Sequence, residues 1–331
     1  MLLLPSLCTL KLLKPMNTIS PPATSNFFSR AWIYSREMFP LHLYLPYVIA
    51  LYTCLHIASQ ALAGGPVVFD IYGVTGLVSA FCMMLLLRTF DELKDVEIDK
   101  DLFPERALPR GDVKVSDVRI LSIASFSVLL LVNFLFARQT WLPFFIMITY
   151  AVLTFKWFFA EKIHRENLFL TMMTHQPLPL FINYYLINVA LAAGGADHPF
   201  TFGHFILLLL FSLPVTAWEV ARKIRGLGKE TDYVTFSRIF GARGAAYIPL
   251  VCLMLSGAFC LYTGRTLGLS SSFFIITSAL MVYAAFFFIR FIVQPTHQNN
   301  VLKNTALAFT TLLFFNMLFH LLQKYGLQWQ L

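Results

Sequence analysis

The sequence predicts an all-α, polytopic membrane protein with nine transmembrane helices, and three observations lead to this prediction. Of the 331 residues, 58% are hydrophobic and only 13% are charged, and the mean hydropathy is +0.69. That composition is far too apolar for an ordinary soluble domain. Nine apolar segments approach the ~20 residues that a helix needs to cross a bilayer. Basic residues gather in alternate connections between these segments, as a fixed membrane topology requires.

Residues 1–40 precede the first apolar segment and are predicted to form a flexible lead and an interfacial segment. In the lead, a leucine run is followed, not preceded, by Lys11 and Lys14, which is the wrong order for a secretory signal. The stretch from Ala31 to Pro40 mixes aromatic and charged side chains. This mixture is typical of an amphipathic segment at the membrane surface.

Residues 41–325 are predicted to form one membrane domain. Its nine expected spans lie at about 41–63, 71–90, 118–137, 141–159, 168–192, 201–221, 245–264, 271–294 and 304–323. All but three of the 25 Lys and Arg residues lie in the lead or in the loops after the even-numbered spans. The exceptions are Arg138, Arg265 and Lys324. This bias predicts a cytoplasmic amino terminus and a carboxyl terminus on the opposite side.

Several classes of partner and site are excluded by the distribution of charged and metal-binding residues. The net charge is +8, but the basic residues form no continuous patch, so we expect no nucleic-acid partner. The five cysteines lie in or beside apolar stretches without a Cys-x-x-Cys pair, and the eight histidines show no paired ligand spacing. Neither a zinc site nor a disulfide framework is therefore expected.

The densest group of charges follows the second apolar segment. If the helix continues there, Asp91, Asp95 and Asp99 fall at i, i+4 and i+8, with a rise of about 6 Å between them. Glu92 and Glu97 flank that face. Like charges at this spacing repel each other by about 0.2–0.5 kcal/mol per pair, so the array favours cations. Hard carboxylate oxygens suit Mg²⁺, which leaves other positions to water and substrate phosphates.

The chain beyond the acids supplies the opposite charge. Pro104 and Pro109 cannot continue a helix, so Arg106 and Arg110 lie on a turn that can fold back over the acidic face. Mg²⁺ bound by carboxylates, with guanidinium groups beside it, is an arrangement that can bind a diphosphate. A solvated, charge-balanced loop is the alternative. The charge density and the turn-by-turn spacing of the acids favour the site.

The sequence Asp91-Glu92-Leu-Lys-Asp95-Val-Glu97-Ile-Asp99 resembles the first aspartate-rich motif, Asn-Asp-x-x-Asp-x-x-x-Asp, of the UbiA superfamily of intramembrane prenyltransferases. Arg106-Ala-Leu-Pro-Arg-Gly111 resembles the Arg-Pro-Leu-Pro-x-Gly that follows it in that family. Asp91 replaces the family's Asn and Glu92 its first Asp, so oxygen ligands remain. The resemblance covers essentially all of the chain after residue 40. It implies nine helices around a central cavity, with acidic loops on the cytoplasmic side.

The resemblance also implies a second acidic site after the sixth span. The corresponding stretch runs from Trp218 to Asp232, and Glu219 matches the leading Asp of the family. Arg222 and Lys223 stand where further acids are usual. Either a second Mg²⁺ binds at Glu219, or the basic side chains hold phosphate oxygens directly.

Two further regions resemble parts of the family or carry polar groups inside a span. Tyr150 and Lys156, at the end of the fourth span, resemble a Tyr and a Lys of the family. The fifth span includes Asn183 and Tyr184. Polar groups inside a span usually face a cavity or another helix, so they line an acceptor pocket or join helices.

The resemblance therefore implies an Mg²⁺-dependent intramembrane prenyltransferase that ionises an allylic prenyl diphosphate and transfers the prenyl group to an aromatic or lipid acceptor. The expected metal ligands are Asp91, Glu92, Asp95, Asp99 and Glu219. The expected catalytic residues are Asp91, Asp95, Arg106, Lys156 and Glu219. The expected substrate-binding residues are Arg88, Arg110, Arg222, Lys223, Asn183 and Tyr184. The alternatives are a membrane terpene cyclase, which needs no acceptor, and a non-catalytic relative or transporter.

The predicted topology can be tested with reporters. A reporter fused after Lys324 should lie on the non-cytoplasmic side, because the basic loops retain the other face in the cytoplasm. One inserted near Asp112 should be cytoplasmic. Protease protection in sealed vesicles measures both, and finding the two reporters on the same side contradicts the predicted helix count.

Overall fold

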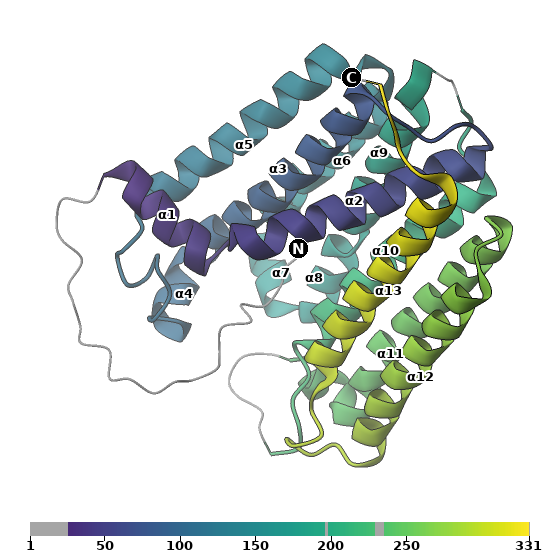
Figure 1. Cartoon of the computed structure of the whole chain (residues 1–331). Helices are drawn as coiled ribbons and strands as arrows, with labels where there is room; N and C mark the ends of the chain where they lie inside the picture. Colours follow the sequence, from purple (N-terminus) through teal and green to yellow (C-terminus); the bar gives the residue numbers. More distant parts are fainter. Residues whose placement is uncertain (1–25, 196–197, 229–234, 331) are drawn as a thin grey trace. The chain divides into compact units, whose positions relative to one another are not determined.

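The computed structural model describes residues 26–195, 198–228 and 235–330, and these residues are almost entirely helical (Figure 1). Seven of the described helices are long and apolar enough to cross a membrane. They are α2 (Leu41–Ala63), α3 (Ile71–Lys94), α5 (Val115–Phe136), α10 (Phe202–Ala221), α11 (Phe236–Thr266), α12 (Ser271–Val293) and α13 (Leu302–Tyr325). The predicted class, an all-α polytopic membrane protein, is confirmed.

The fourth and fifth predicted spans are helical, but each is interrupted. Helix α6 (Trp141–Phe155) has 15 residues and is followed by the 3-10 turn η2 (Trp157–Phe159). The fifth span is divided at Gln176 into α8 (Leu168–His175) and α9 (Pro177–Ala192). Proline at the first position of α9 lacks the backbone N–H that a continuous helix would need. The count of nine spans therefore stays a prediction.

The remaining elements are short. They are α1 (Phe27–Glu37), α4 (Val96–Leu102), α7 (Glu161–Glu166), the 3-10 turns η1 (Arg138–Thr140) and η3 (Ala193–Gly195), and the strands β1 (Val68–Phe69) and β2 (Gln328–Trp329). The two strands pair in parallel, with Phe69 opposite Trp329. Helix α1 lies where the interfacial segment was expected. Residues 1–25 of the predicted lead lie outside the described residues.

The chain forms two compact units whose boundaries fall inside α2, α3 and α5. The first unit comprises residues 1–49 and 78–132, and the second comprises residues 50–77 and 133–331. The first aspartate-rich stretch belongs to the first unit. The stretch that begins at Glu219 belongs to the second unit.

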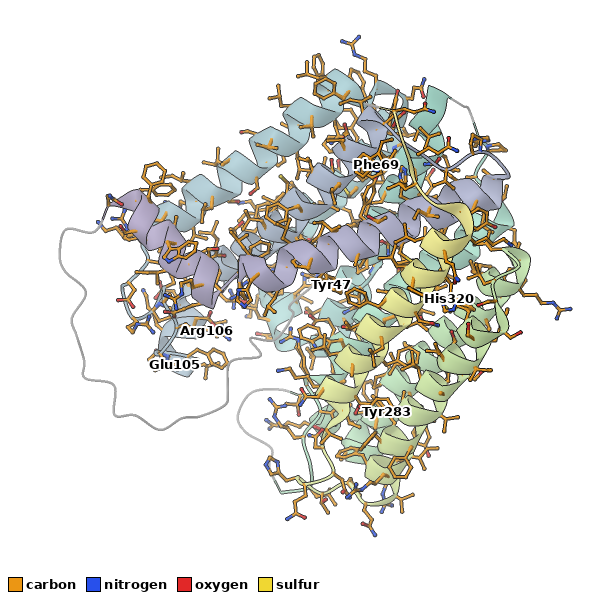
Figure 2. All side chains as sticks on the ribbon, in the orientation of Figure 1. Tyr47, Phe69, Glu105, Arg106, Tyr283 and His320 are labelled. Carbon is orange, nitrogen blue, oxygen red and sulfur yellow. The ribbon has the colours of Figure 1, made fainter. Side chains whose placement is uncertain are left out.

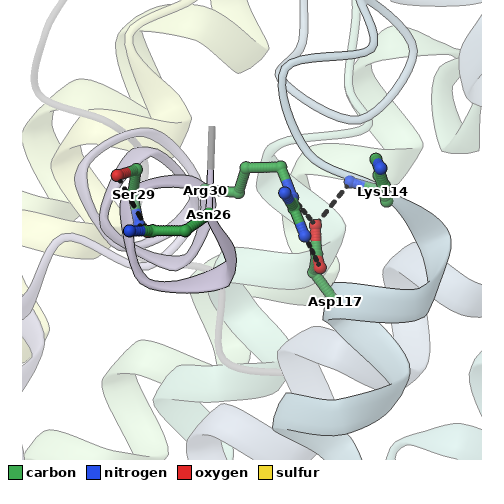
Figure 3. A network of polar contacts seen from close by, with 5 residues as sticks. All are labelled: Asn26, Ser29, Arg30, Lys114 and Asp117. Carbon is green, nitrogen blue, oxygen red and sulfur yellow. Dashed lines mark hydrogen bonds and ion pairs between the residues drawn. The ribbon is translucent and has the colours of Figure 1, made fainter. Parts of the chain in front are cut away.

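In the first unit, a buried ion pair fastens α1 to the start of α5 (Figure 3). Asp117 is 1% exposed, and Arg30 donates to both of its oxygens, at 2.6 and 2.8 Å. The same carboxylate accepts the backbone N–H of Lys114 at 2.9 Å, which satisfies a free amide at the start of α5. Both oxygens of this acid are therefore occupied by structural contacts.

In the second unit, small residues allow α11 and α12 to pack closely. A Cβ built at Gly264 of α11 would overlap the ring of Phe273 in α12, which is fully buried. Asn316 of α13 donates to Thr277 of α12 at 3.0 Å, which joins the next pair of helices. Close backbone approach and interhelical hydrogen bonds are the main sources of helix association in a membrane.

We predict that Gly264→Ala lowers the thermal stability of the purified protein, because the buried Phe273 ring cannot move aside. Overpacking of this kind costs about 1–3 kcal/mol. Gly244→Ala in the same helix is the matched control, since its Cβ would lie at an ordinary 3.6 Å from the nearest atom. Thermal melting in detergent should show a lower Tm for the first variant only. Equal melting temperatures contradict the packing described here.

Candidate functional site

The acidic stretch of the first unit spans the junction of α3 and α4. The expectation of one continuous helix is wrong at Asp95, which lies between the two helices with φ −107° and ψ 14°. The four-residue spacing nevertheless persists, because the N–H of Asp95 bonds to the carbonyl of Asp91 at 3.1 Å and that of Asp99 to Asp95 at 2.8 Å. Asp is a weak helix former in helix interiors, and its like-charged neighbours repel each other, so this is a natural place for a break.

Glu92 is held by Arg88, one helical turn earlier. Glu92 is 2% exposed and Arg88 is 8% exposed, and the two form an ion pair. Arg88 also donates from Nε to the carbonyl oxygen of Met38 at 3.1 Å. The Oε2 atom of Glu92 is buried and has no hydrogen-bond partner among the described residues. The structure thus brings together Glu92, an expected metal ligand, and Arg88, an expected substrate-binding residue. One carboxylate oxygen of Glu92 has no hydrogen-bond partner among the described residues.

Arg106 folds back onto the acids, as the prolines of its turn predict. Its Nη1 lies 2.6 Å from Oδ2 of Asp99, which is 6% exposed. The guanidinium carbon lies 3.9 Å from the centre of the Phe103 ring. Arg106 and its neighbour Glu105 extend from the loop after α4 (Figure 2). The ion pair fixes this arginine beside the acidic stretch.

Arg110 has a different set of contacts from the one expected. It donates to Asp112, to the carbonyl of Glu105 at 2.6 Å and to the carboxylate of Glu37 at 3.0 Å. These contacts tie the loop after α4 to the end of α1. Its substrate-binding role stays a prediction.

Tyr34 of α1 is a part of this cluster that the sequence did not reveal. It is 1% exposed, and its hydroxyl has no hydrogen-bond partner among the described residues. Burial raises the pKa of the phenol, and the charges of Arg88 and Glu92 also act on it. It therefore remains a neutral hydroxyl group close to the buried ion pair. The sequence indicated only an interfacial aromatic residue here, because its partners are more than 50 residues away.

The acidic stretch fits Mg²⁺ in its chemistry. Within the described ranges, no group of three or more His, Cys, Asp or Glu side chains is gathered as a ready metal site. Mg²⁺ typically takes only one or two carboxylates and completes its shell with water and phosphate oxygens. The buried free oxygen of Glu92 is the kind of atom that a cation would satisfy.

In the second unit, Glu219 lies near the end of α10 and pairs with Arg222. Glu219 is 6% exposed, and its Oε2 accepts from Nε and Nη2 of Arg222 at 2.8 and 2.7 Å. Its Oε1 is buried without a hydrogen-bond partner in the described part of the chain. The arginine thus occupies one oxygen of this acid. Residues 229–234, which include the remaining acids of this stretch, lie outside the described residues.

One basic residue from a distant part of the sequence, Lys303, lies near Arg222. Asn300 donates to the carbonyl of Ile224 at 2.9 Å, and the N–H of Leu227 bonds to the carbonyl of Pro295 at 2.9 Å. This packing brings Lys303, at the start of α13, within electrostatic range of Arg222 and Arg225. No local motif marks Lys303, because its neighbours lie about 80 residues earlier.

The other expected site residues of the second unit have mixed placements. Lys156 is exposed at the end of α6, with its ammonium group 5.2 Å from the Phe155 ring. Asn183 donates a hydrogen bond to Ser212 of α10 at 3.0 Å. This contact joins two helices, which is one of the two roles expected for a polar group inside a span. The Tyr184 ring packs on Phe200 at 5.4 Å. The substrate-facing roles of these residues stay predictions.

Comparison with known proteins agrees with this fold. The model of the UbiA prenyltransferase family matches residues 50–321. A solved structure of a digeranylgeranylglyceryl phosphate synthase in membranes is similar, with a TM-score of 0.63 and 13% identity over 89% of this chain and 99% of that one. The apo structure of a UbiA homologue from Aeropyrum pernix K1 has a TM-score of 0.59 and 14% identity, over 82% and 96%. No curated protein sequence gives a match.

At these identities the two structures establish the fold alone, whereas the family model accounts for most of the length of the chain. The first aspartate-rich stretch and the Arg106 turn fall inside the matched region. The chain belongs to the UbiA prenyltransferase family.

Proposed function

We propose that this protein ionises an allylic prenyl diphosphate with the help of Mg²⁺ and transfers the prenyl group to a hydrophobic acceptor, aromatic or lipid. The observation that carries the proposal is the cluster of buried acids and arginines at the junction of α3 and α4. Membership in a family of prenyltransferases supports it. The proposed orientation has the amino terminus in the cytoplasm.

The acids of the first unit would hold the metal, and its arginines would hold the substrate. The proposed ligands are Asp91, Glu92, Asp95 and Asp99. A bound Mg²⁺ would supply positive charge that neutralises the diphosphate as it leaves. Arg88 and Arg106 now contact single carboxylates, and a diphosphate offers each a stronger, bidentate acceptor. Arg110 keeps the loop in place through Glu37 and Asp112.

The second unit carries a group of fixed positive charges. Arg222 pairs with Glu219, and Lys303 lies within electrostatic range of Arg222 and Arg225. Like charges held together favour an anion between them, and guanidinium groups suit phosphate oxygens. Lys223 and Lys156 are proposed to add to this charge. Glu219 would serve a second metal only if Arg222 released it.

A terpene cyclase remains the second candidate function. The ion pair between Glu219 and Arg222 occupies the acid that would hold a second metal. A reaction of one substrate needs ionisation and a shaped apolar wall but no second site for an acceptor. Prenyl transfer is favoured because the matched family is one of prenyltransferases.

The proposed reaction can be tested with the purified full chain in lipid nanodiscs. With Mg²⁺ and prenyl diphosphates of increasing length, it should release pyrophosphate. With added membrane lipid extract it should form a prenylated adduct, which mass spectrometry identifies. If a cyclic hydrocarbon or alcohol forms from the diphosphate alone and the extract yields no adduct, the protein is a terpene cyclase and not a prenyltransferase. No release from any diphosphate contradicts both readings.

Two variants of the acidic stretch separate metal binding from general charge in this assay. Asp95→Asn should insert normally but lower Mg²⁺-dependent pyrophosphate release about 100-fold, because loss of one electrostatic group typically costs this much. Glu97→Gln is the matched control, since Glu97 is exposed and pairs with Lys100 at the surface. Full activity of Asp95→Asn, or of the unaltered protein in EDTA, contradicts the metal assignment.

A further inference from the structure

Two loops of the second unit pack tightly at the end of α10 and the start of α13. A Cβ built at Gly226 would lie 2.6 Å from the backbone nitrogen of His297, closer than real Cβ atoms approach. The N–H of Arg225 bonds to the hydroxyl of Ser237 at 2.8 Å, which fixes the same loop to the start of α11. The side chains that follow α10 are therefore held in a defined place beside α13.

Three cationic side chains lie close together at these loops. Arg225 donates from Nη1 to the carbonyl of Arg222 at 3.0 Å, and Lys303 lies within electrostatic range of both arginines. All three are half-buried, so they keep some access to solvent. Arg222 pairs with Glu219, but Lys303 has no hydrogen bond or ion pair with a described residue. An anion would stabilise its charge, because its charged neighbours are positive and partial burial removes water.

Trp218, one helical turn before Arg222, adds a buried donor to this place. It is 7% exposed, and its Nε1 has no hydrogen-bond partner among the described residues. The guanidinium carbon of Arg222 lies 5.4 Å from the centre of its ring. An indole N–H can only donate, and a buried donor without a partner is costly. The indole and the Lys303 ammonium thus both lack an acceptor in the described part of the chain.

The donor chemistry of this place does not fit a metal ion. The family's second acidic motif implies a metal at Glu219, with further acids after it. In the described stretch 218–228, Glu219 is the one acid, and Arg222 stands where the next acid is usual. Nε and Nη2 of Arg222 lie 2.8 and 2.7 Å from its Oε2. Guanidinium, ammonium and indole N–H groups offer a metal no lone pair, and the cationic ones repel it.

We propose that this place binds a phosphate-type anion without a metal ion, with Arg222 and Lys303 supplying the positive charge and Trp218 donating from Nε1. Phosphate oxygens accept several hydrogen bonds at once, and guanidinium and ammonium groups are their usual partners. The inference rests on the proposed function and deepens it, because it assigns the second unit a metal-independent hold on a diphosphate. The headgroup of an anionic lipid offers the same oxygens, so experiment must distinguish these two sources.

Binding of radiolabelled pyrophosphate in the presence of EDTA tests the site in the full chain, held in phosphatidylcholine nanodiscs. The unaltered protein should bind pyrophosphate without a divalent metal. Lys303→Gln should weaken this binding about tenfold, because one hydrogen bond from a charged donor is lost. Its Tm should be unchanged, since Lys303 pairs with no described acid. No binding in EDTA, or equal affinity of the variant, overturns the proposal.

Two further variants separate the site from a general loss of charge. Trp218→Phe keeps a ring beside Arg222 but lacks the N–H, so affinity in EDTA should fall about threefold or more. Full affinity overturns the assignment of the indole donor. Arg290→Gln removes one positive charge at an exposed position in the last turn of α12 and should bind as the unaltered protein does. If it weakens binding as much as Lys303→Gln does, net charge alone acts and the site is overturned.

The number of bound metal ions tests the same assignment without turnover. Mn²⁺ titration in the presence of pyrophosphate, followed by electron paramagnetic resonance, counts the ions that the unaltered protein and Glu219→Gln bind. The two counts should be equal, because Glu219 holds no metal. Pyrophosphate binding in EDTA should tighten in this variant, since a competing negative charge is lost. A count that falls by one ion overturns the proposal.

Nanodiscs that contain phosphatidylglycerol identify the source of the anion. If a lipid headgroup takes the site, this lipid should weaken pyrophosphate binding in EDTA to the unaltered protein more than to Lys303→Gln. Unchanged binding to the unaltered protein assigns the site to a soluble diphosphate. Either result keeps a metal-free anion site.

The binding test and the reaction test fail separately. Pyrophosphate release from a prenyl diphosphate with Mg²⁺, measured in the same preparation, tests the proposed function. Intact release without any binding in EDTA overturns only the metal-free site. Binding in EDTA that Lys303→Gln weakens, without any release, overturns only the proposed reaction.

Discussion

The need to pair buried carboxylates with arginines organises the charged parts of this protein. In the described part of the chain, every buried acid has an arginine partner. The pairs are Glu92 with Arg88, Asp99 with Arg106, Asp117 with Arg30 and Glu219 with Arg222. Breaking such a pair by removing one partner is strongly destabilising, because it leaves a charge that is both buried and uncompensated. Charge pairing therefore constrains where α1, α3, α5 and α10 can place their polar ends.

The four pairs differ in how completely they satisfy the acid. Both oxygens of Asp117 accept hydrogen bonds from Arg30, and one also accepts from the backbone, so this pair serves the fold. Glu92 and Glu219 each retain a buried oxygen with no hydrogen-bond partner among the described residues. An incomplete pair can accept a cation, and its arginine can turn to a better anion. This difference separates the pair of Asp117 and Arg30, which serves the fold, from the pairs at Glu92 and Glu219.

The sequence predicted the membrane class and the four-residue spacing of the acids after α3, because hydropathy and spacing are local properties. It did not predict the break at Asp95, where intrinsic helix preference outweighs the pattern. Hydropathy averages over the interruption of the fifth span, which only Pro177 and Pro179 within it indicate. Tyr34 and Lys303 were missed for another reason. Their partners are distant in the sequence, so only the folded chain brings them to Arg88 and to Arg222.

Under the proposed function, the pair of Arg88 and Glu92 exchanges its ion pair for a bound anion, whereas the pair of Arg30 and Asp117 only stabilises the fold. Binding of radiolabelled pyrophosphate with Mg²⁺, measured by equilibrium dialysis, tests it most directly. Arg88→Lys should weaken binding about tenfold or more, because lysine cannot form the bidentate fork. Arg30→Lys, in the fully satisfied pair, should lower the Tm but leave pyrophosphate affinity unchanged. Equal affinity of the unaltered protein and Arg88→Lys would contradict the account.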